Sequence, residues 1–81
     1  MNEIEKVVRE ELGKLTKADV MNMSIDEDIS EYTGLDSLSF LELFGKIEEK
    51  FKILVPPEKT SDIQTIADVI KIVEESKKSW S

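Results

Sequence analysis

The 81-residue chain contains no cysteine and no histidine. Without cysteine it cannot form disulfides or thiolate metal sites, and it has no thiol nucleophile of its own. Without histidine it lacks the commonest general base, the Ser–His dyad and imidazole metal ligands. We therefore expect that the chain is not an enzyme and that it holds no metal ion.

Long hydrophobic runs and positive charge are also scarce. No apolar run approaches the roughly 20 residues that span a bilayer, and the N-terminal segment has no signal-peptide apolar core. Lys and Arg total 11 against 18 Asp and Glu, a formal net charge of −7. Phosphate groups attract basic proteins, so neither nucleic acid nor an anionic membrane surface is expected as the main partner. The lack of a long apolar run argues against membrane insertion. We predict a cytoplasmic protein whose partners present Lys and Arg.

The length allows one small domain. Hydrophobic residues make up 40% of the chain and charged residues 36%, which favours a folded protein over a disordered acidic tail. A chain this short buries only about 60% of the surface that it exposes when unfolded, so its stability is modest. We expect a monomer with a single domain over residues 1–81, a core at about residues 2–75 and a frayed tail at residues 76–81.

The first periodic segment runs from about residue 2 to residue 15. Its apolar side chains recur at the spacing of one helical face: Ile4, Val7, Val8, Leu12 and Leu15. Charged side chains, Arg9 among them, fill the opposite face. The pattern predicts an amphipathic helix with one core face and one solvated face.

Residues 16–36 break this pattern and are rich in turn and cap formers. A structureless loop that long is uncommon in a compact domain and usually has a function. Its spaced acidic residues are reminiscent of a calcium loop. However, Glu31 stands where the sharp turn needs glycine, and Ser37 where a bidentate glutamate is needed. We predict a long connecting loop that binds no metal.

A second helix is predicted from near residues 36–39 to near residues 50–52. At about 100° per residue, one face carries the apolar side chains Phe40, Leu43, Phe44, Ile47 and Phe51. This face must meet the core. Ser39 and Glu42 have the spacing of a capping box at the start of the helix.

Two prolines in residues 52–57 (KILVPP) prevent the second helix from continuing. Residues 57–61 have room for one short helical turn, with proline at its first position. A last helix begins with Thr65 as N-cap and Asp68 three residues on. The chain thus predicts an all-α fold, a small four-helix bundle. It comprises three main helices and one short helix, with a long loop between helices 1 and 2.

The non-core face of the second helix combines apolar and acidic residues: Leu38, Leu41, Gly45, Glu42 and Glu49, with Glu48 at its border. A small apolar patch ringed by carboxylates suits a partner with apolar and basic residues. Isolated exposed leucines are nevertheless common. From the residues alone, a docking surface and an ordinary solvated face are equally open interpretations.

Ser37 follows Asp36 at the predicted start of this helix. Either residue is suited to cap the helix, and a cap is the simpler interpretation. As a nucleophile, Ser37 has no histidine to activate it and no lysine nearby in the sequence, which argues against a hydrolase. If Ser37 is functional, modification by another enzyme fits it better than catalysis.

Residues 34–38 (GLDSL), followed by 40–43 (FLEL) and 47–51 (IEEKF), resemble the acyl carrier protein family. The resemblance extends over nearly the whole chain. It includes the N-terminal helix, the long first loop, the apolar-Pro step at residues 55–56 and the last two helices. The Asp-Ser-Leu tripeptide alone is a weak signal. Its place in this order of elements, inside an acidic chain of this length, makes the resemblance specific.

This resemblance implies that Ser37 carries 4′-phosphopantetheine through a phosphodiester made by a separate phosphopantetheinyl transferase. Acyl groups then travel as thioesters on this arm to acyl-transferring or synthase enzymes of fatty-acid, polyketide or related lipid biosynthesis. Basic patches of the partners are expected to dock on Asp36, Leu38, Leu41, Glu42, Glu48 and Glu49. Phe40, Phe44 and Ile63 are candidates for lining an acyl pocket, although each also suits the core.

Departures from the family pattern leave alternatives open. Ser39 stands where many fatty-acid carriers have an acid, and Gly45 replaces a larger apolar residue. Residues 53–56 (ILVP) are similar to D-alanyl carrier proteins, so a specialised aminoacyl or D-alanyl carrier is one alternative. A hypothesis from a different class is a small acidic helical interaction module without a prosthetic group, in which Ser37 only caps a helix.

Overall fold

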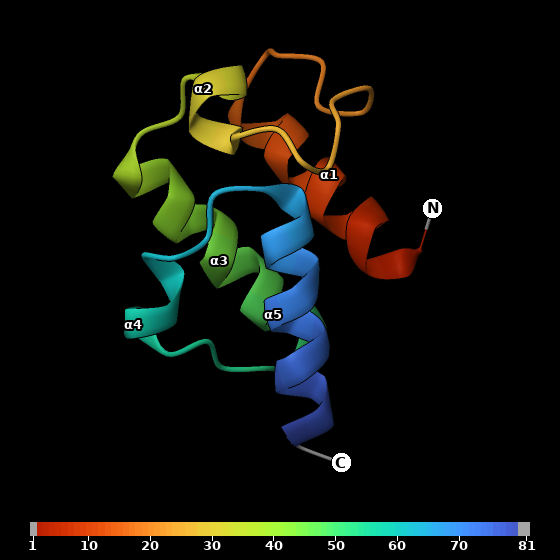
Figure 1. Cartoon of the computed structure of the whole chain (residues 1–81), viewed down its shortest axis with the longest axis vertical. Coiled ribbons are helices and arrows are strands. Elements are labelled where there is room, and N and C mark those ends of the chain that lie inside the picture. The colour runs from red at the N-terminus through yellow and green to blue at the C-terminus, as the bar shows by residue number, and fades with distance from the viewer. Residues whose placement is uncertain (1, 80–81) are drawn as a thin grey trace.

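The structure is a computed structural model that describes residues 2–79. Within these residues the chain forms five helices and no strand, which confirms the predicted all-α class. Three helices are long and two are short. Figure 1 shows how they are arranged. Their bounds are α1 Glu3–Leu15, α2 Ile29–Thr33, α3 Ser37–Phe51, α4 Pro57–Thr60 and α5 Ile66–Ser79.

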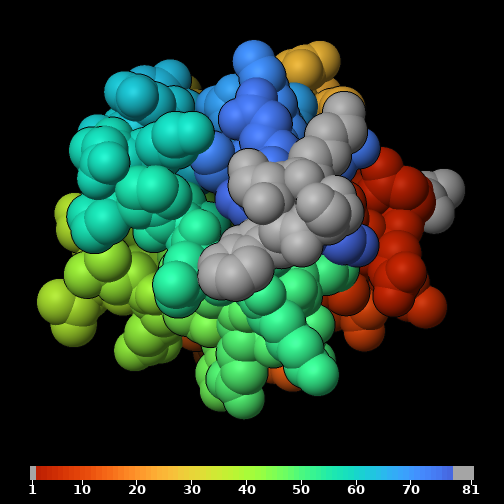
Figure 2. Space-filling model, turned by 90° about the horizontal axis from the view of Figure 1, so that it is seen from below, coloured from red at the N-terminus to blue at the C-terminus, as the bar shows by residue number. Residues whose placement is uncertain are grey.

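Helix α1 begins at the predicted place because Asn2 caps it, its side chain accepting the N–H of Glu5 at 2.7 Å. The helix packs against both α3 and α5. Viewed from below, α1 and α4 lie on opposite sides of the molecule (Figure 2). The side chains at the centre of the core are fully buried: Val8, Leu12, Ile29, Leu43, Ile47, Ile66, Val69 and Val73.

Arg9 differs from the prediction, because it is buried and not on a solvated face. Its Nη1 donates to the carbonyl oxygens of Val20 at 2.6 Å and Met23 at 2.8 Å, and its Nε pairs with Glu5 at 3.0 Å. The first loop passes over α1 and needs donors for its inward-facing carbonyls. Arg9 therefore fixes this loop to α1.

The loop between α1 and α3 is also more regular than predicted, because it contains α2. Asp28 caps this helix by accepting the N–H of Glu31 at 3.0 Å. Gly34 ends it with a φ of 74°, and its N–H donates to the carbonyl oxygen of Ser30. One cap at each end suffices for a single turn, so a short helix arises in a stretch without helical periodicity.

The end of α3 turns back through a residue that was predicted as a docking acid. The carbonyl oxygen of Glu48 accepts the N–H groups of Lys52 and, at 3.1 Å, Ile53. The Oε2 atom of the same glutamate accepts the N–H of Val55 at 2.8 Å. These bonds turn the chain so that Ile53 and Val55 enter the core. The predicted short turn follows as α4.

Helix α5 begins as predicted. Thr65 Oγ1 accepts the N–H of Asp68 and Asp68 Oδ2 accepts the N–H of Thr65, each at 3.1 Å, which is a capping box. The chain remains helical to Ser79, past the predicted start of a frayed tail at residue 76. The last two residues of that tail, 80 and 81, lie outside the described residues. Among residues 2–79, no helix combines the length and hydropathy that crossing a bilayer demands.

Candidate functional site

The site lies where the loop ends and α3 begins. Asp36 is the N-cap of α3, with its side chain accepting the N–H of Ser39 at 2.9 Å. Ser37 is consequently the first helical residue. The predicted capping box of Ser39 with Glu42 is wrong, because Ser39 lies inside the first turn and is itself capped by Asp36.

Asp36 is negatively charged at neutral pH. The backbone N–H of Ser39, followed by its hydroxyl, lowers the pKa of the Asp36 carboxyl below its ordinary value of 3.8. The N-terminus of a helix also favours negative charge. A fixed carboxylate therefore stands directly beside Ser37.

Ser37 is exposed, and its hydroxyl has no hydrogen-bond partner among residues 2–79. Two other exposed serines, Ser24 and Ser61, are engaged. The hydroxyl of Ser24 accepts the N–H of Asp26 at 3.2 Å, and that of Ser61 donates to the carbonyl of Glu58 at 3.1 Å. Ser37 thus offers a free hydroxyl at the start of a long helix, where an added group would meet solvent.

Ser37 also lines a groove of about 410 Å³, which we call the Ser37 groove. Its walls come from three places along the chain: the start of α2, the first half of α3 and residues within 60–64. The apolar part consists of Phe40, Leu41, Phe44 and Ile63. The structure therefore brings together Ser37 and all three residues that were named from the sequence as candidates for an acyl pocket.

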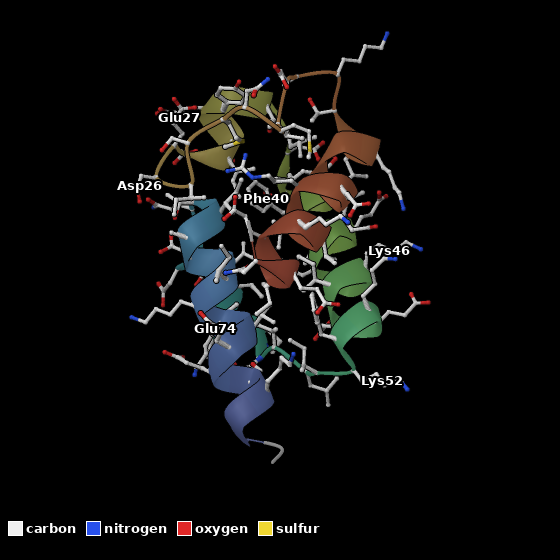
Figure 3. The ribbon with its side chains drawn as sticks, turned by 90° about the vertical axis from the view of Figure 1, so that its right-hand side faces the viewer. Asp26, Glu27, Phe40, Lys46, Lys52 and Glu74 are labelled. Carbon is white, nitrogen blue, oxygen red and sulfur yellow. The ribbon has the colours of Figure 1, made fainter. Side chains whose placement is uncertain are left out.

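The apolar part of the groove borders side chains of the filled core. Phe40 and Phe44 stand with their ring centroids 6.3 Å apart, and Phe44 is only 4% exposed. Figure 3 shows Phe40 within the outline of the helices, whereas Lys46 projects away from α3. Behind the rings, Leu43 and Ile47 are fully buried. The groove is a surface feature that ends against the core.

Backbone hydrogen bonds hold the loop wall of the groove against the start of α5. The N–H of Ile29 donates to the carbonyl of Gln64 at 2.7 Å, and the N–H of Ala67 donates to the carbonyl of Ile25 at 3.0 Å. Ser30 and Gln64 face the groove from these two segments. Sequence reasoning missed both residues, because no periodicity or motif links loop positions that lie so far apart in the chain.

The exposed face of α3, defined here as Leu38, Leu41, Glu42, Gly45 and Glu49, is open as the sequence predicts. Leu38 is 70% exposed and Leu41 is 62% exposed. Leu41 also lines the Ser37 groove, so the groove opens onto this face. Glu48 differs from its neighbours, because it is half-buried and its carboxylate is occupied by the N–H of Val55.

A model of the protein family described as "Phosphopantetheine attachment site" matches residues 6–73, which include Ser37 and every segment of the groove. The chain belongs to the acyl carrier protein family. Proteins named "Acyl carrier protein" are similar to it over most of its length. That of Rickettsia bellii (strain RML369-C) is 35% identical over 72 residues, covering 89% of this chain and 79% of the relative.

Other bacterial relatives carry the same name. The acyl carrier protein of Helicobacter acinonychis (strain Sheeba) is 32% identical over 75 residues, 93% of this chain and 91% of the relative. That of Exiguobacterium sibiricum is 26% identical over 72 residues, 89% of this chain and 86% of the relative. The match and these relatives support 4′-phosphopantetheine as the prosthetic group. An exposed, unpartnered hydroxyl beside a groove that combines polar and apolar side chains fits such a group.

Proposed function

We propose that this protein carries acyl intermediates as thioesters on a 4′-phosphopantetheine arm attached to Ser37 and delivers them to enzymes of fatty-acid, polyketide or related lipid biosynthesis. The observation that carries the proposal is the free, exposed Ser37 hydroxyl at the first position of α3, inside the matched region. The names of the bacterial relatives support an acyl cargo.

Each residue near the attachment point has a part in this function. Ser37 contributes the oxygen of the phosphodiester, and the N-terminus of α3 favours the negative charge that this ester brings. Phe40, Phe44 and Ile63 offer apolar surface to the first part of an acyl chain. When bound, the prosthetic group supplies a terminal thiol that forms thioesters. The chain itself has no cysteine, so this thiol has no competitor.

The docking of partners is assigned to the acidic and apolar residues around Ser37: Asp36, Leu38, Leu41, Glu42, Glu48 and Glu49. Leu38 and Leu41 are large apolar side chains that the fold leaves in water, and Glu42 and Glu49 stand exposed on the same face. The chain as a whole has a net charge of −7, and this acidic surface suits a phosphopantetheinyl transferase and synthases that present basic patches. Glu48 contributes charge at the border while it holds the chain after α3.

In this proposal the protein is a carrier and not a catalyst. Neither histidine nor cysteine occurs in the chain, so Ser37 has no imidazole or thiolate to activate it. We further propose that the protein acts in the cytoplasm, and that it acts as a monomer, which leaves the exposed face of α3 free for successive partners.

The test is the intact mass of the purified apo protein after incubation with coenzyme A and a broad-specificity phosphopantetheinyl transferase. We expect a gain equal to one phosphopantetheine group, and we expect Ser37→Ala to abolish it. Ser24→Ala is the matched control, because it removes another exposed serine hydroxyl within the family match but outside the groove. It should load like the wild type.

Absence of any gain in the wild-type protein would favour the interaction module without a prosthetic group. A gain that persists in Ser37→Ala would place the attachment on a different residue. Either result overturns the proposal.

A further inference from the structure

The wall of the Ser37 groove includes two polar side chains that the fold itself does not use. The hydroxyl of Ser30 and the carboxamide of Gln64 line the groove, are exposed and have no hydrogen-bond partner among residues 2–79. The other polar side chains of this wall are engaged. Thr60 Oγ1 donates to the carbonyl of Pro57 at 2.7 Å, and Asp28 Oδ1 accepts the N–H of Glu31 at 3.0 Å.

A backbone hydrogen bond joins the two segments that carry these unused groups. The carbonyl of Gln64 accepts the N–H of Ile29 at 2.7 Å, and Ser30 is the next residue along the chain. The N–H of Gln64 in turn donates to Asp68 Oδ2 at 3.0 Å. Both backbone polar groups of Gln64 are therefore fixed. Only its side chain is left to bind a ligand. The hydroxyl of Ser30 is likewise left without a partner among the described residues.

The chemistry of this pair indicates the kind of ligand. A hydroxyl and a carboxamide each offer a donor and an acceptor and carry no charge. They complement a neutral secondary amide, which also has one donor and one acceptor. Phosphopantetheine contains two such amides between its phosphate and its thiol. The same groove also contains Ser37 at one side and the apolar surface of Phe40, Phe44 and Ile63.

We propose that Ser30 and Gln64 form a binding site for the amide groups of the arm attached at Ser37. This inference rests on the proposed function. The two side chains would hold the arm against the protein between deliveries, and a held arm would expose its thiol less to reagents in solution. Because neutral hydrogen bonds at an exposed site are weak, the arm is released readily to a partner.

The test uses the reactivity of the arm's thiol in the loaded protein without cargo. The chain has no cysteine, so a small maleimide reports on this thiol alone. We expect the thiol to react about two- to ten-fold faster in Ser30→Ala and in Gln64→Leu than in the wild type, the factor that one hydrogen bond of ordinary net strength gives. Ser76→Ala, a serine of α5 outside the groove, should react like the wild type.

A second readout is the amide spectrum of the protein with and without the arm. We expect the side-chain NH₂ signals of Gln64 and the backbone signal of Ser30 to shift when phosphopantetheine alone is attached. Equal thiol reactivity in all variants, or shifts that require an acyl group on the arm, would overturn the inference. The loading mass is measured first on every variant, so failure of the arm to attach at Ser37 is distinguished from failure of this site.

Discussion

The two faces of α3 carry similar residues but differ in burial and in hydrogen bonding. Leu43 is fully buried, whereas Leu41, two residues earlier, is 62% exposed. Glu48 is bonded to the chain that follows, whereas Glu49 is exposed and takes part in no ion pair among the described residues. The buried face packs against the rest of the molecule. The exposed face is left unused by the fold, and this makes it available to partners.

The largest expected effect comes from making the same substitution on both faces. Leu43→Ala should lower the free energy of unfolding by about 2–5 kcal/mol, because it leaves a cavity in the core. Leu41→Ala should lower it by less than about 0.5 kcal/mol, as surface substitutions do. Urea unfolding of both variants measures the difference. Equal losses would show that the exposed face also belongs to the core.

Glu48 and Glu49 provide the second comparison. Glu48→Ala removes the acceptor of the Val55 N–H. It should lower the free energy of unfolding by about 1.5–3 kcal/mol, the range for hydrogen bonds to charged groups. Glu49→Ala should change the free energy of unfolding by no more than about 0.5 kcal/mol. The same denaturation experiment applies. If Glu48→Ala unfolds with the same free energy as the wild type, Glu48 has no structural role and only its proposed docking role is left.

Leu41 and Leu54 test whether the exposed face recognises partners. Both are large apolar side chains in water, 62% and 71% exposed, but Leu54 lies outside α3. Leu41→Ala should lower kcat/KM of a phosphopantetheinyl transferase for the apo protein by about tenfold, as truncation of an interface anchor does. Leu54→Ala should leave this kcat/KM unchanged. Similar losses in both variants would mean that exposed leucines act without regard to position.

The smallest effect is expected at Gly45 on the exposed face. A Cβ atom added there meets nothing within 4 Å, so Gly45→Ala should raise the free energy of unfolding by about 1 kcal/mol through helix propensity alone. Gly34→Ala is the contrasting variant, because Gly34 has a φ of 74° and alanine there should destabilise by about 1–2 kcal/mol. Thermal unfolding ranks the two, and a destabilised Gly45→Ala would reveal a contact that this account lacks.

Much of the fold can be predicted from the sequence, because the three long helices have clear apolar faces and because capping residues and prolines mark several of their ends. Periodicity finds the core face of α3, the prolines limit it, and Thr65 with Asp68 starts α5. The loop is harder. Periodicity assigns Arg9 to a polar face, but it cannot see that a distant segment will lie over this face and bring carbonyls to the guanidinium.

Part of the candidate site could likewise be predicted from the sequence, because that part is local in the chain. The motif around Ser37 is local, so the start of α3 and its exposed leucines could be inferred from consecutive residues. The wall that faces Ser37 is not local. The backbone hydrogen bond between Ile29 and Gln64 brings the segments of Ser30 and Gln64 together. No pattern in either segment predicts this pairing. Short capping interactions likewise decide between Asp36 and Ser39, two polar residues that both suit a helix start.

We propose Ser37 as the attachment point of the prosthetic group. The most direct measurement is fragmentation mass spectrometry of the loaded protein, which locates the added mass on a single residue. We expect to find the phosphopantetheine group on Ser37 alone. Finding it on Ser30, the other free and exposed serine of the groove, or on any residue outside α3, would rule out Ser37 as the attachment point.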